Sequence, residues 1–421
     1  MGHETRIGRR GVLGSGLALG AAALAPLGGC DAAARPTRPF AGPLAQGHSV
    51  VARVPADGRF YYMHDPGVVA LPGGVVIAAM PCLERPTQSS FGVASWRTFM
   101  ARSRDGGATW EPLPTLPYSD ATPFVHAGRL YMFVQPEKWK DWSITTSDDL
   151  GATWSAPVRL FTGALWNADS PLVLHRGNLL FSLSTRDYQG GVVVVAADAA
   201  RDLMDPGAWR MSAEAKYPET PQGVVAPGAN TKGDWWLEPN VVVVGGRVRV
   251  LLRTLIANYG TSSLCAVCDL VDEPGRFALS FSQFHPVPGA QCKVYVMWDE
   301  PSRLFWMLSN QPADTQERVF DWRAIREGGF LGGGGNDRRF LMLWYSVDAL
   351  SWFPAGCVAR TQNPHQSFMY PSADIDGPDL LVLSRTSFAG RDQHDADAVT
   401  FHRVADFRAL AMDLYPSEVR A

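Results

Sequence analysis

Several segments of this chain place a side chain that can move protons just before a proline. They are His64-Asp65-Pro66, Asp169-Ser170-Pro171, Glu238-Pro239-Asn240 and Tyr370-Pro371-Ser372. Histidine titrates near neutral pH and can act as base and as acid. Carboxylates and tyrosine exchange protons as well, and they can also attack carbon. If the fold gathers these four positions, they form a site for acid–base or nucleophilic chemistry.

A longer frame around these segments indicates how they are positioned. A polar or small residue and a proline are followed by apolar residues, a turn and more apolar residues. The frame occurs six times between Pro66 and Pro371, with Lys293 in the place of the fifth proline, and neighbouring copies lie 48 to 78 residues apart. This spacing predicts four-stranded modules and hence an all-β, six-bladed β-propeller. The 78-residue interval could hold one more module, so seven blades is the alternative.

The propeller topology predicts where the frame residues lie. The innermost strands line a central channel and begin at one of its mouths, so the residues before each proline should ring that mouth. The predicted pocket contains His64, Asp65, Thr122, Asp169, Ser170, Glu238, Lys293 and Tyr370. We expect Val50–Val54 to pair with Val399–Val404 and close the ring, because joining the two ends removes exposed sheet edges.

A short motif, Ser-x-Asp-x-Gly-x-Thr-Trp, occurs at Ser103–Trp110 and again at Ser147–Trp154, with a shortened copy at Ser346–Trp352. Its serine and aspartate can bond within a hairpin turn, its glycine supplies a positive backbone angle, and its tryptophan can anchor the turn. The motif resembles the Asp-box of the sialidase superfamily, whose members are β-propellers and largely enzymes or binding proteins for glycans. The resemblance implies this fold over most of residues 60–410.

Two further stretches are similar to sialidase active-site segments. Glu238-Pro239-Asn240 with Arg253 resembles the stretch that carries the catalytic glutamate and one arginine of a carboxylate-binding group. Tyr370-Pro371-Ser372 resembles the stretch of the nucleophilic tyrosine, and Arg385 on the next predicted strand is a further candidate for the anion-binding group. The resemblance implies a tyrosine that attacks the anomeric carbon after the glutamate takes its proton.

The chain also departs from the sialidase pattern. His64-Asp65-Pro66 stands where sialidases begin their first blade with Arg-Ile-Pro, and Arg97 lies about where they carry an acid/base aspartate. The exchanged residues suit β-elimination at a uronate, with His64 as base, Tyr370 as proton donor or nucleophile, and Arg97, Arg253 and Lys293 neutralising the carboxylate. Histidine-bearing members of the superfamily include ulvan lyases and enzymes that cleave rhamnosyl–glucuronate bonds.

Three other residues are candidates for substrate binding. Trp166 could stack on a sugar ring, and Asp169 could bind sugar hydroxyls. His394 lies in a C-terminal run, Asp392 to Arg403, that resembles the end of uncharacterised sialidase-like enzymes. The leading prediction is therefore a polysaccharide or oligosaccharide lyase or glycosidase acting on uronic-acid glycans. The alternatives are an exo-α-sialidase with a Tyr–Glu nucleophile pair and a non-catalytic glycan-binding lipoprotein.

The N-terminal segment predicts export. Arg9 and Arg10 precede an apolar run from Val12 to Leu27, which has the form of a twin-arginine signal peptide over residues 1–30. The run ends at Cys30 in a sequence that resembles a lipobox, so Cys30 would carry the lipid. Residues 31–47 read as a flexible tether and residues 48–421 as a single propeller domain. We expect a periplasmic or cell-surface lipoprotein.

The composition of the chain limits the kinds of partner and cofactor that we expect it to bind. The net charge is −3, which does not favour a nucleic-acid surface. The pair Cys265 and Cys268 lies in a predicted strand, which would point the two thiols to opposite faces, so we expect buried thiols and no metal site there. No cofactor is expected, although a structural calcium ion held by loop carbonyls would leave little trace in the sequence. We expect a monomer that binds an acidic oligosaccharide or polysaccharide.

Overall fold

The computed structural model describes residues 42–412 except 85–95, 186–189, 222, 224–233, 257–262, 313–336 and 391. The signal peptide predicted for residues 1–30, Cys30 and the tether up to residue 41 lie outside the described residues. The compact unit that carries all the sheets begins at Gly42. In the described part, no helix is long and apolar enough to cross a membrane.

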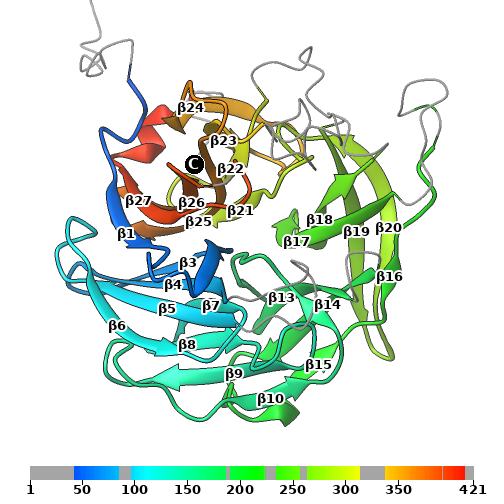
Figure 1. Cartoon of the computed structure of the whole chain (residues 1–421). Coiled ribbons are helices and arrows are strands. Elements are labelled where there is room, and N and C mark those ends of the chain that lie inside the picture. Colours follow the sequence, from blue (N-terminus) through cyan, green and yellow to red (C-terminus); the bar gives the residue numbers. More distant parts are fainter. Residues whose placement is uncertain are drawn as a thin grey trace, which may run out of the picture. The chain divides into compact units, whose positions relative to one another are not determined.

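Six antiparallel sheets follow one another along the described chain and form the blades of a propeller (Figure 1). Blade 1 contains β3 (Gly67–Leu71), β4 (Val75–Glu84), β5 (Trp96–Ser103) and β6 (Glu111–Leu116), with β2 (Phe60–Met63) also paired to β4. Blade 2 contains β7 (Ala121–His126), β8 (Arg129–Val134), β9 (Trp142–Ser147) and β10 (Val158–Phe161). Blade 3 contains β11 (Leu165–Trp166), β12 (Val173–His175), β13 (Asn178–Thr185), β14 (Gly191–Asp198), β15 (Trp209–Met211) and β16 (Ala215–Lys216).

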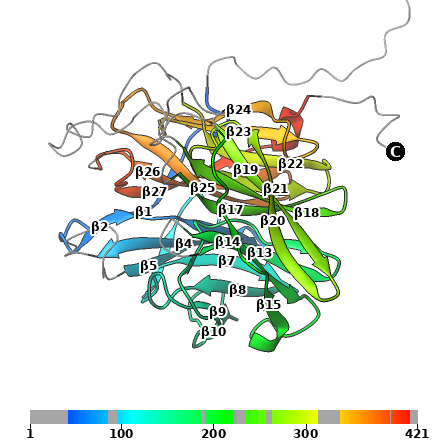
Figure 2. The same ribbon diagram turned by 90° about the vertical axis from the view of Figure 1, so that its right-hand side faces the viewer.

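The second half of the chain repeats the arrangement, and Figure 2 brings blade 4 toward the viewer. Blade 4 contains β17 (Trp235–Val244), β18 (Arg247–Leu255), β19 (Leu264–Glu273) and β20 (Arg276–Pro286). Blade 5 contains β21 (Tyr295–Asp299), β22 (Leu304–Asn310), β23 (Phe340–Ser346) and β24 (Phe353–Arg360). Blade 6 contains β25 (Ser367–Asp376), β26 (Asp379–Ser387), β27 (Ala398–Val404) and β1 (Ser49–Arg53). The prediction of a six-bladed, all-β propeller is confirmed, and seven blades is wrong.

The ring closes through the two ends of the described chain. Strand β1 pairs with β27, with Ser49 opposite Phe401 and Arg53 opposite Ala398, and Figure 1 shows the blue strand beside the red one. The predicted pairing of Val50–Val54 with Val399–Val404 is confirmed. Because β27 is covered by β1, the last blade gains its fourth strand from a segment at the other end of the chain.

The core lies between neighbouring blades, where the apolar faces of two sheets meet. Between blades 2 and 3, Phe133, Trp142 and Phe181 are fully buried, with Phe133 and Phe181 rings 5.0 Å apart. Burial of each such ring contributes roughly 1.5–3 kcal/mol to stability. The two thiols of β19 also follow this layering, since Cys265 packs between blades 4 and 5 and Cys268 between blades 3 and 4.

The repeated sequence motif forms the same hydrogen-bonded turn in each copy. The Asp105 carboxylate accepts from the Ser103 hydroxyl at 2.7 Å and from the backbone and hydroxyl of Thr109 at 2.9 and 2.5 Å. Asp149 accepts from the equivalent groups at 2.8, 2.8 and 2.6 Å. Asp348 holds the shortened copy in the same way through Ser346 and Ser351. These turns join the third and fourth strands of blades 1, 2 and 5.

Side chains on or beside the inner strands bond to the next blade and fix the ring around the channel. Asn167 donates to the Pro239 carbonyl at 3.2 Å, and Asn240 donates to the Val294 carbonyl at 3.2 Å. The Tyr295 hydroxyl donates to the Ala373 carbonyl at 2.8 Å, which joins blade 5 to blade 6. Because these contacts lie beside the frame residues, they hold the channel mouth in one geometry.

Candidate active site

Two of the inner strands carry a kink at the position that faces the channel mouth. Glu238 and Tyr370 adopt positive φ angles of 55° and 47°, and the pairing register of β17 and β25 shifts beside them. A left-handed backbone at a residue other than glycine costs about 1–3 kcal/mol and is found most often at functional sites. Here the kink turns the side chains of Glu238 and Tyr370 toward a third residue, Arg253.

Arg253 joins the two kinked residues. Its Nη1 donates to both carboxylate oxygens of Glu238 at 2.9 and 3.0 Å and to the Tyr370 hydroxyl at 3.1 Å. Its Nε donates to the Gln291 carbonyl at 2.8 Å, which fixes the guanidinium plane. Burial, reinforced by the Glu238 charge, raises the pKa of Tyr370 to about 12, although Arg253 opposes the shift. The tyrosine is therefore protonated at neutral pH.

Two more arginines face the same tyrosine. The Cζ of Arg385, a fully buried residue of β26, lies 4.9 Å from the ring centroid of Tyr370 and 4.9 Å from that of Tyr62. The Cζ of Arg338 lies 5.5 Å from the Tyr370 ring. Arg338 was not predicted from the sequence, because a single arginine before a strand carries no pattern of its own. Arg253, Arg338 and Arg385 are called the arginine cluster below.

His64 is connected to this cluster through Asp65. Its Nδ1 lies 2.9 Å from Oδ2 of Asp65, and Oδ1 of Asp65 lies 3.7 Å from Nη1 of Arg385. Burial lowers the pKa of His64, so its ring is neutral at physiological pH and can accept a proton. Burial alone would raise the pKa of Asp65, but contact with the His64 ring and the charges of Arg385 and Lys138 outweigh burial and lower it.

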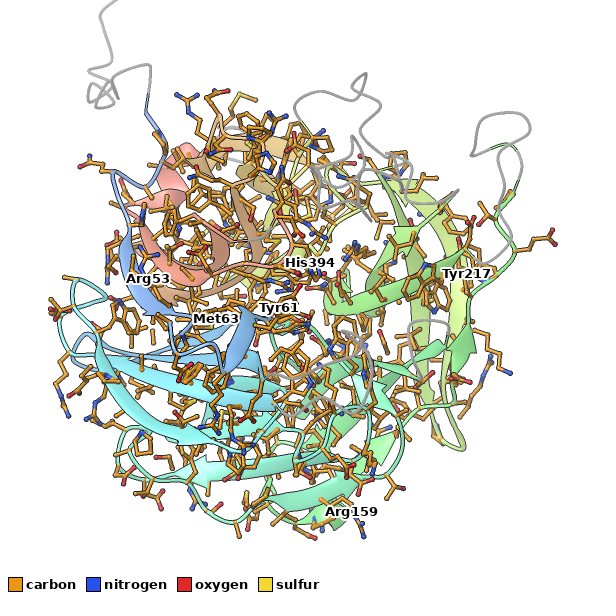
Figure 3. The ribbon with its side chains drawn as sticks, viewed as in Figure 1. Arg53, Tyr61, Met63, Arg159, Tyr217 and His394 are labelled. Carbon is orange, nitrogen blue, oxygen red and sulfur yellow. The ribbon has the colours of Figure 1, made fainter. Side chains whose placement is uncertain are left out.

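His394 and Asp395 lie on the other side of Arg385. The Nδ1 of His394 is 2.8 Å from Asp395 Oδ1, and Arg385 Nη2 donates to the His394 carbonyl. The His394 side chain is 41% exposed, and Figure 3 places it with Tyr61 near the centre of the ring of blades. Desolvation and the positive charge of Arg385 lower the pKa of His394, against the opposing effect of Asp395.

A second cationic group, also missed in the sequence analysis, lies on the side of blades 1 to 3. Lys138 Nζ donates to both carboxylate oxygens of Asp120 at 2.8 and 3.0 Å. It also lies 4.8, 5.2 and 5.8 Å from the ring centroids of Trp96, Trp139 and Trp166, within the range of cation–π attraction. Trp166 is only 2% exposed and packs against Trp139, so its ring has no open face for a sugar in this structure.

Arg97 is not brought to the arginine cluster. Its Nη2 lies 3.8 Å from Glu84, its Nη1 donates to the Trp96 carbonyl, and its side chain is 36% exposed. The preceding residue of β5, Trp96, contacts His64 instead, with ring centroids 4.9 Å apart. Successive side chains of a strand point to opposite faces, so only one of this pair can reach the mouth.

Asp169 and Lys293 lie deeper in the channel than the sequence analysis expected of substrate-binding groups. Both are almost completely buried, at 5% and 2% exposure. Lys293 Nζ donates to the Pro371 carbonyl and lies 5.1 Å from the Tyr295 ring centroid. Burial raises the pKa of Asp169 and lowers that of Lys293, while the charge of each partner opposes the shift of the other.

Two groups of described residues have donor atoms close enough together to suit a metal ion. They are His64, Asp65 and Asp120, and Asp392, His394 and Asp395. Each already faces a cationic side chain, because Lys138 binds Asp120 and Arg385 binds the His394 carbonyl. A metal ion in either place would therefore have to compete with a resident positive charge.

Comparison with known proteins identifies the fold but no family. No protein-family model and no curated protein matches the chain. Among solved structures, the chain is similar to a Trypanosoma rangeli sialidase mutant displaying trans-sialidase activity, with 16% identity and a TM-score of 0.54. That match covers 88% of this chain and 59% of the trypanosomal one, so this chain spans well under two thirds of its length.

Two bacterial structures match at a similar level. The NanB sialidase of Streptococcus pneumoniae has 10% identity and a TM-score of 0.53, covering 86% of this chain and 71% of that one. The intramolecular trans-sialidase of Ruminococcus gnavus has 13% identity and a TM-score of 0.53, covering 88% and 99%. At these identities the likeness shows that the chain has the sialidase-like propeller fold, and function has to be argued from the site.

Proposed function

We propose that this protein cleaves a glycosidic bond at a carboxylate-bearing sugar, with Tyr370 as the reacting group. The observation that carries the proposal is the convergence of three guanidinium groups on one tyrosine. Arg253 bonds to its hydroxyl, and Arg338 and Arg385 lie against its ring. Arginine is well suited to carboxylates, because its planar fork can donate two parallel bonds.

The arginine cluster holds donors that a substrate carboxylate could use once it displaces the side chains that cover them in this structure. Nε of Arg338 and Nε of Arg385 are buried and have no hydrogen-bond partner among the described residues, and Nη1 of Arg385 has no hydrogen bond there but lies 3.7 Å from Asp65 Oδ1. Leaving one buried donor unsatisfied costs about 1–3 kcal/mol, and more when the group is charged. A bound carboxylate would remove this cost, which favours an anionic sugar over a neutral one.

The chemistry that this arrangement supports best is displacement at the anomeric carbon. The Tyr370 oxygen would bond to that carbon while its proton passes to Glu238, which shares the same Arg253 nitrogen. The glycosidic C–O bond would break, and the departing oxygen would take up a proton. Water would then attack the same carbon, release the sugar and return a proton to Tyr370, so configuration is retained overall.

Elimination at a uronate is the second candidate, and His64 is the observation that favours it. Its buried, neutral ring beside Asp65 could remove the C5 proton of a uronate whose carboxylate is bound by the arginine cluster. The electron pair would form a C4=C5 double bond while the C4–O bond breaks and the leaving oxygen is protonated. The product would carry an ultraviolet-absorbing unsaturated uronate.

One experiment separates these candidates. The purified protein is incubated with a sialoside carrying a fluorogenic leaving group and, separately, with uronic-acid polysaccharides; fluorescence, new reducing ends and ultraviolet absorbance are recorded. Displacement predicts product without absorbance, loss of turnover in Tyr370→Phe and retained turnover in His64→Ala. Elimination predicts absorbance that His64→Ala abolishes. Glycan binding without turnover of any substrate would contradict both and support a non-catalytic glycan-binding protein.

We further propose that the protein is exported and lipid-anchored through Cys30. The support is the twin arginines Arg9 and Arg10, the apolar run after them and the cysteine at its end. In a bacterial host, radiolabelled palmitate should be incorporated into the full chain and not into Cys30→Ser. Labelling of both chains, or of neither, would contradict the assignment.

A further inference from the structure

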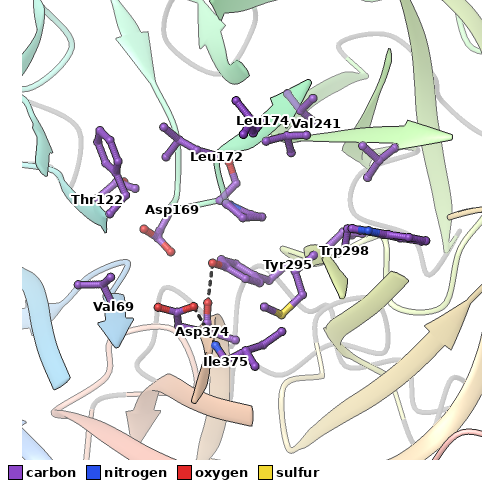
Figure 4. A pocket seen from close by; sticks show the side chains of 18 of the residues that line it. Val69, Thr122, Asp169, Leu172, Leu174, Val241, Tyr295, Trp298, Asp374 and Ile375 are labelled. Carbon is purple, nitrogen blue, oxygen red and sulfur yellow. Dashed lines mark hydrogen bonds between the residues drawn. The ribbon is translucent and has the colours of Figure 1, made fainter. Parts of the chain in front are cut away.

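The opposite end of the central channel contains a cavity of about 740 Å³. We call it the far cavity; Figure 4 shows it from close by. Along each inner strand its residues follow those of the candidate site, so the two regions occupy different ends of the channel. Its volume lies in the range of small-molecule sites, roughly 300–1,000 Å³.

The walls of the far cavity are more apolar than polar. All six blades contribute to them, mainly through valines; the residues include Val68, Val69, Val241, Val242, Val243 and Val296. Three large apolar side chains from different blades line its exposed parts: Leu174 is 63% exposed, Trp298 43% and Val125 40%. Exposed apolar groups gathered around a hollow are typical of a binding site.

Two carboxylates project among these apolar walls, Asp169 from blade 3 and Asp374 from blade 6 (Figure 4). Asp169 is balanced by Lys293 on the side of the candidate site. Asp374 accepts only backbone bonds in the described structure, from Ala70 N at 2.7 Å and Ile375 N at 2.8 Å. Burial raises the pKa of Asp374 to about 6, and no cationic side chain of the described residues counteracts this shift.

The charges of the far cavity are correspondingly one-sided. Its described lining contains the acids Asp169, Asp374 and Glu300, and neither lysine nor arginine. His175 is the one basic side chain, and partial burial together with Arg176 lowers its pKa. A buried carboxylate is stabilised most directly by an opposite charge close to it. Among the described residues that line the far cavity, Asp374 therefore has no cationic partner. A ligand that carries a positive charge could supply this partner and place its apolar part against the valines.

We propose that the far cavity binds an organic ammonium ion with a hydrophobic substituent. The ammonium group pairs with Asp374, and the substituent packs against the valines and the rings of Tyr295 and Trp298. These rings add cation–π attraction where the positive charge passes over them. A bare metal ion would leave the apolar walls unused, and a neutral hydrophobic molecule would leave Asp374 without its counter-ion.

Calorimetric titration of the full chain with 2-phenylethylamine, which is an ammonium ion at pH 7, tests the proposal against the neutral 2-phenylethanol. We expect the amine to bind at least tenfold more tightly than the alcohol. Asp374→Asn should bring the two affinities within about threefold of each other, and the exposed-rim change Glu300→Gln should weaken the amine two- to threefold. Asp148→Asn, at an exposed position elsewhere, should change neither.

The candidate active site supplies an internal control. Tyr370→Phe should leave amine affinity unchanged, so failure of the proposed glycan cleavage and failure of the far-cavity site are distinguishable. Equal affinities for amine and alcohol, no binding of the amine up to millimolar concentration, or undiminished amine preference in Asp374→Asn would each overturn the proposal. If Asp374→Asn does not fold, an unchanged amine affinity in Glu300→Gln together with equal binding of the alcohol decides against it.

Discussion

The two ends of one channel differ in how their polar groups are neutralised. At the candidate site, Glu238 is bonded to Arg253, and Asp65 lies near both His64 and Arg385. In the far cavity, Asp374 accepts only backbone bonds in the described structure. The same inner strands build both ends, and the kinks at Glu238 and Tyr370 mark the transition between them. The difference shows that the blades provide a common scaffold. The position of a residue along its inner strand decides whether its side chain belongs to the candidate site or to the far cavity.

The largest effect is expected when the central ion pair of the candidate site is broken. Glu238→Gln leaves the Arg253 guanidinium buried without the carboxylate that accepts from its Nη1, which should cost about 3–5 kcal/mol of unfolding free energy. Because Glu238 is also the proposed acceptor of the Tyr370 proton, kcat/KM should fall by roughly 1,000-fold. Urea denaturation and steady-state kinetics measure the two quantities. Retained activity would remove Glu238 from the mechanism.

A smaller loss of kcat/KM is expected when Arg385 of the arginine cluster is replaced. Arg385→Met keeps most of the side-chain volume but removes a charge that faces Tyr370, Tyr62 and Asp65. We expect kcat/KM for a carboxylate-bearing substrate to fall about 100-fold. The exposed change Arg97→Met is the matched control and should reduce it much less, because Arg97 lies against Glu84. Equal losses in the two variants would contradict the placement of the cluster.

At the other end of the channel, removing a charge should stabilise the protein. The folded pKa of Asp374 is raised from 3.8 to about 6, so the native state binds more protons than the unfolded chain between these values. Stability should therefore fall as pH rises through that window, and the penalty persists above it. Asp374→Asn should remove this pH dependence and gain up to about 3 kcal/mol at pH 7. Thermal unfolding from pH 4 to 8 measures it.

The smallest effect on stability is expected from substitutions in the turns of the repeated Ser-x-Asp-x-Gly-x-Thr-Trp motif, which belong to neither end of the channel. Hydrogen bonds from Thr109 and Ser103 lower the pKa of Asp105 to about 2. A lowered folded pKa contributes stability above the unfolded value, and that contribution is lost as pH falls toward 2. Asp105→Ala should lower Tm by a few degrees at pH 7 and make less difference near pH 2. The surface change Asp148→Asn should not alter Tm at either pH.

The sequence allowed much of the scaffold to be predicted, because its signals are local and repeated. The repeated proline frames predicted six blades, and the need to cover exposed sheet edges predicted the closure by Val50–Val54. The resemblance to sialidase segments pointed to Glu238, Arg253 and Tyr370, which the structure brings together. Arg338 was missed because its proximity to Tyr370 depends on how blades 5 and 6 pack. This packing produces no recognisable pattern in the sequence around Arg338.

For other residues, a place in the site depends on the exact strand register or on packing, and the sequence pattern does not determine either. Arg97 and Trp96 are neighbours in β5, and a shift of one residue would exchange their faces. Trp166 was predicted to stack on a sugar, but its exposure is set by Trp139, which lies far from any proline frame. Lys138 carries no motif, and only the packing of Trp96, Trp139 and Trp166 around it makes its charge distinctive.

We propose that the arginine cluster recognises a carboxylate and presents its sugar to Tyr370. The most direct measurement compares, with the same enzyme preparation, the cleavage rate of one carboxylate-bearing glycoside and of its methyl ester. Loss of the negative charge should reduce kcat/KM at least 100-fold in the unmodified protein, and Arg385→Met should reduce that ratio several-fold. Equal rates for acid and ester would contradict the account, whatever the reaction proves to be.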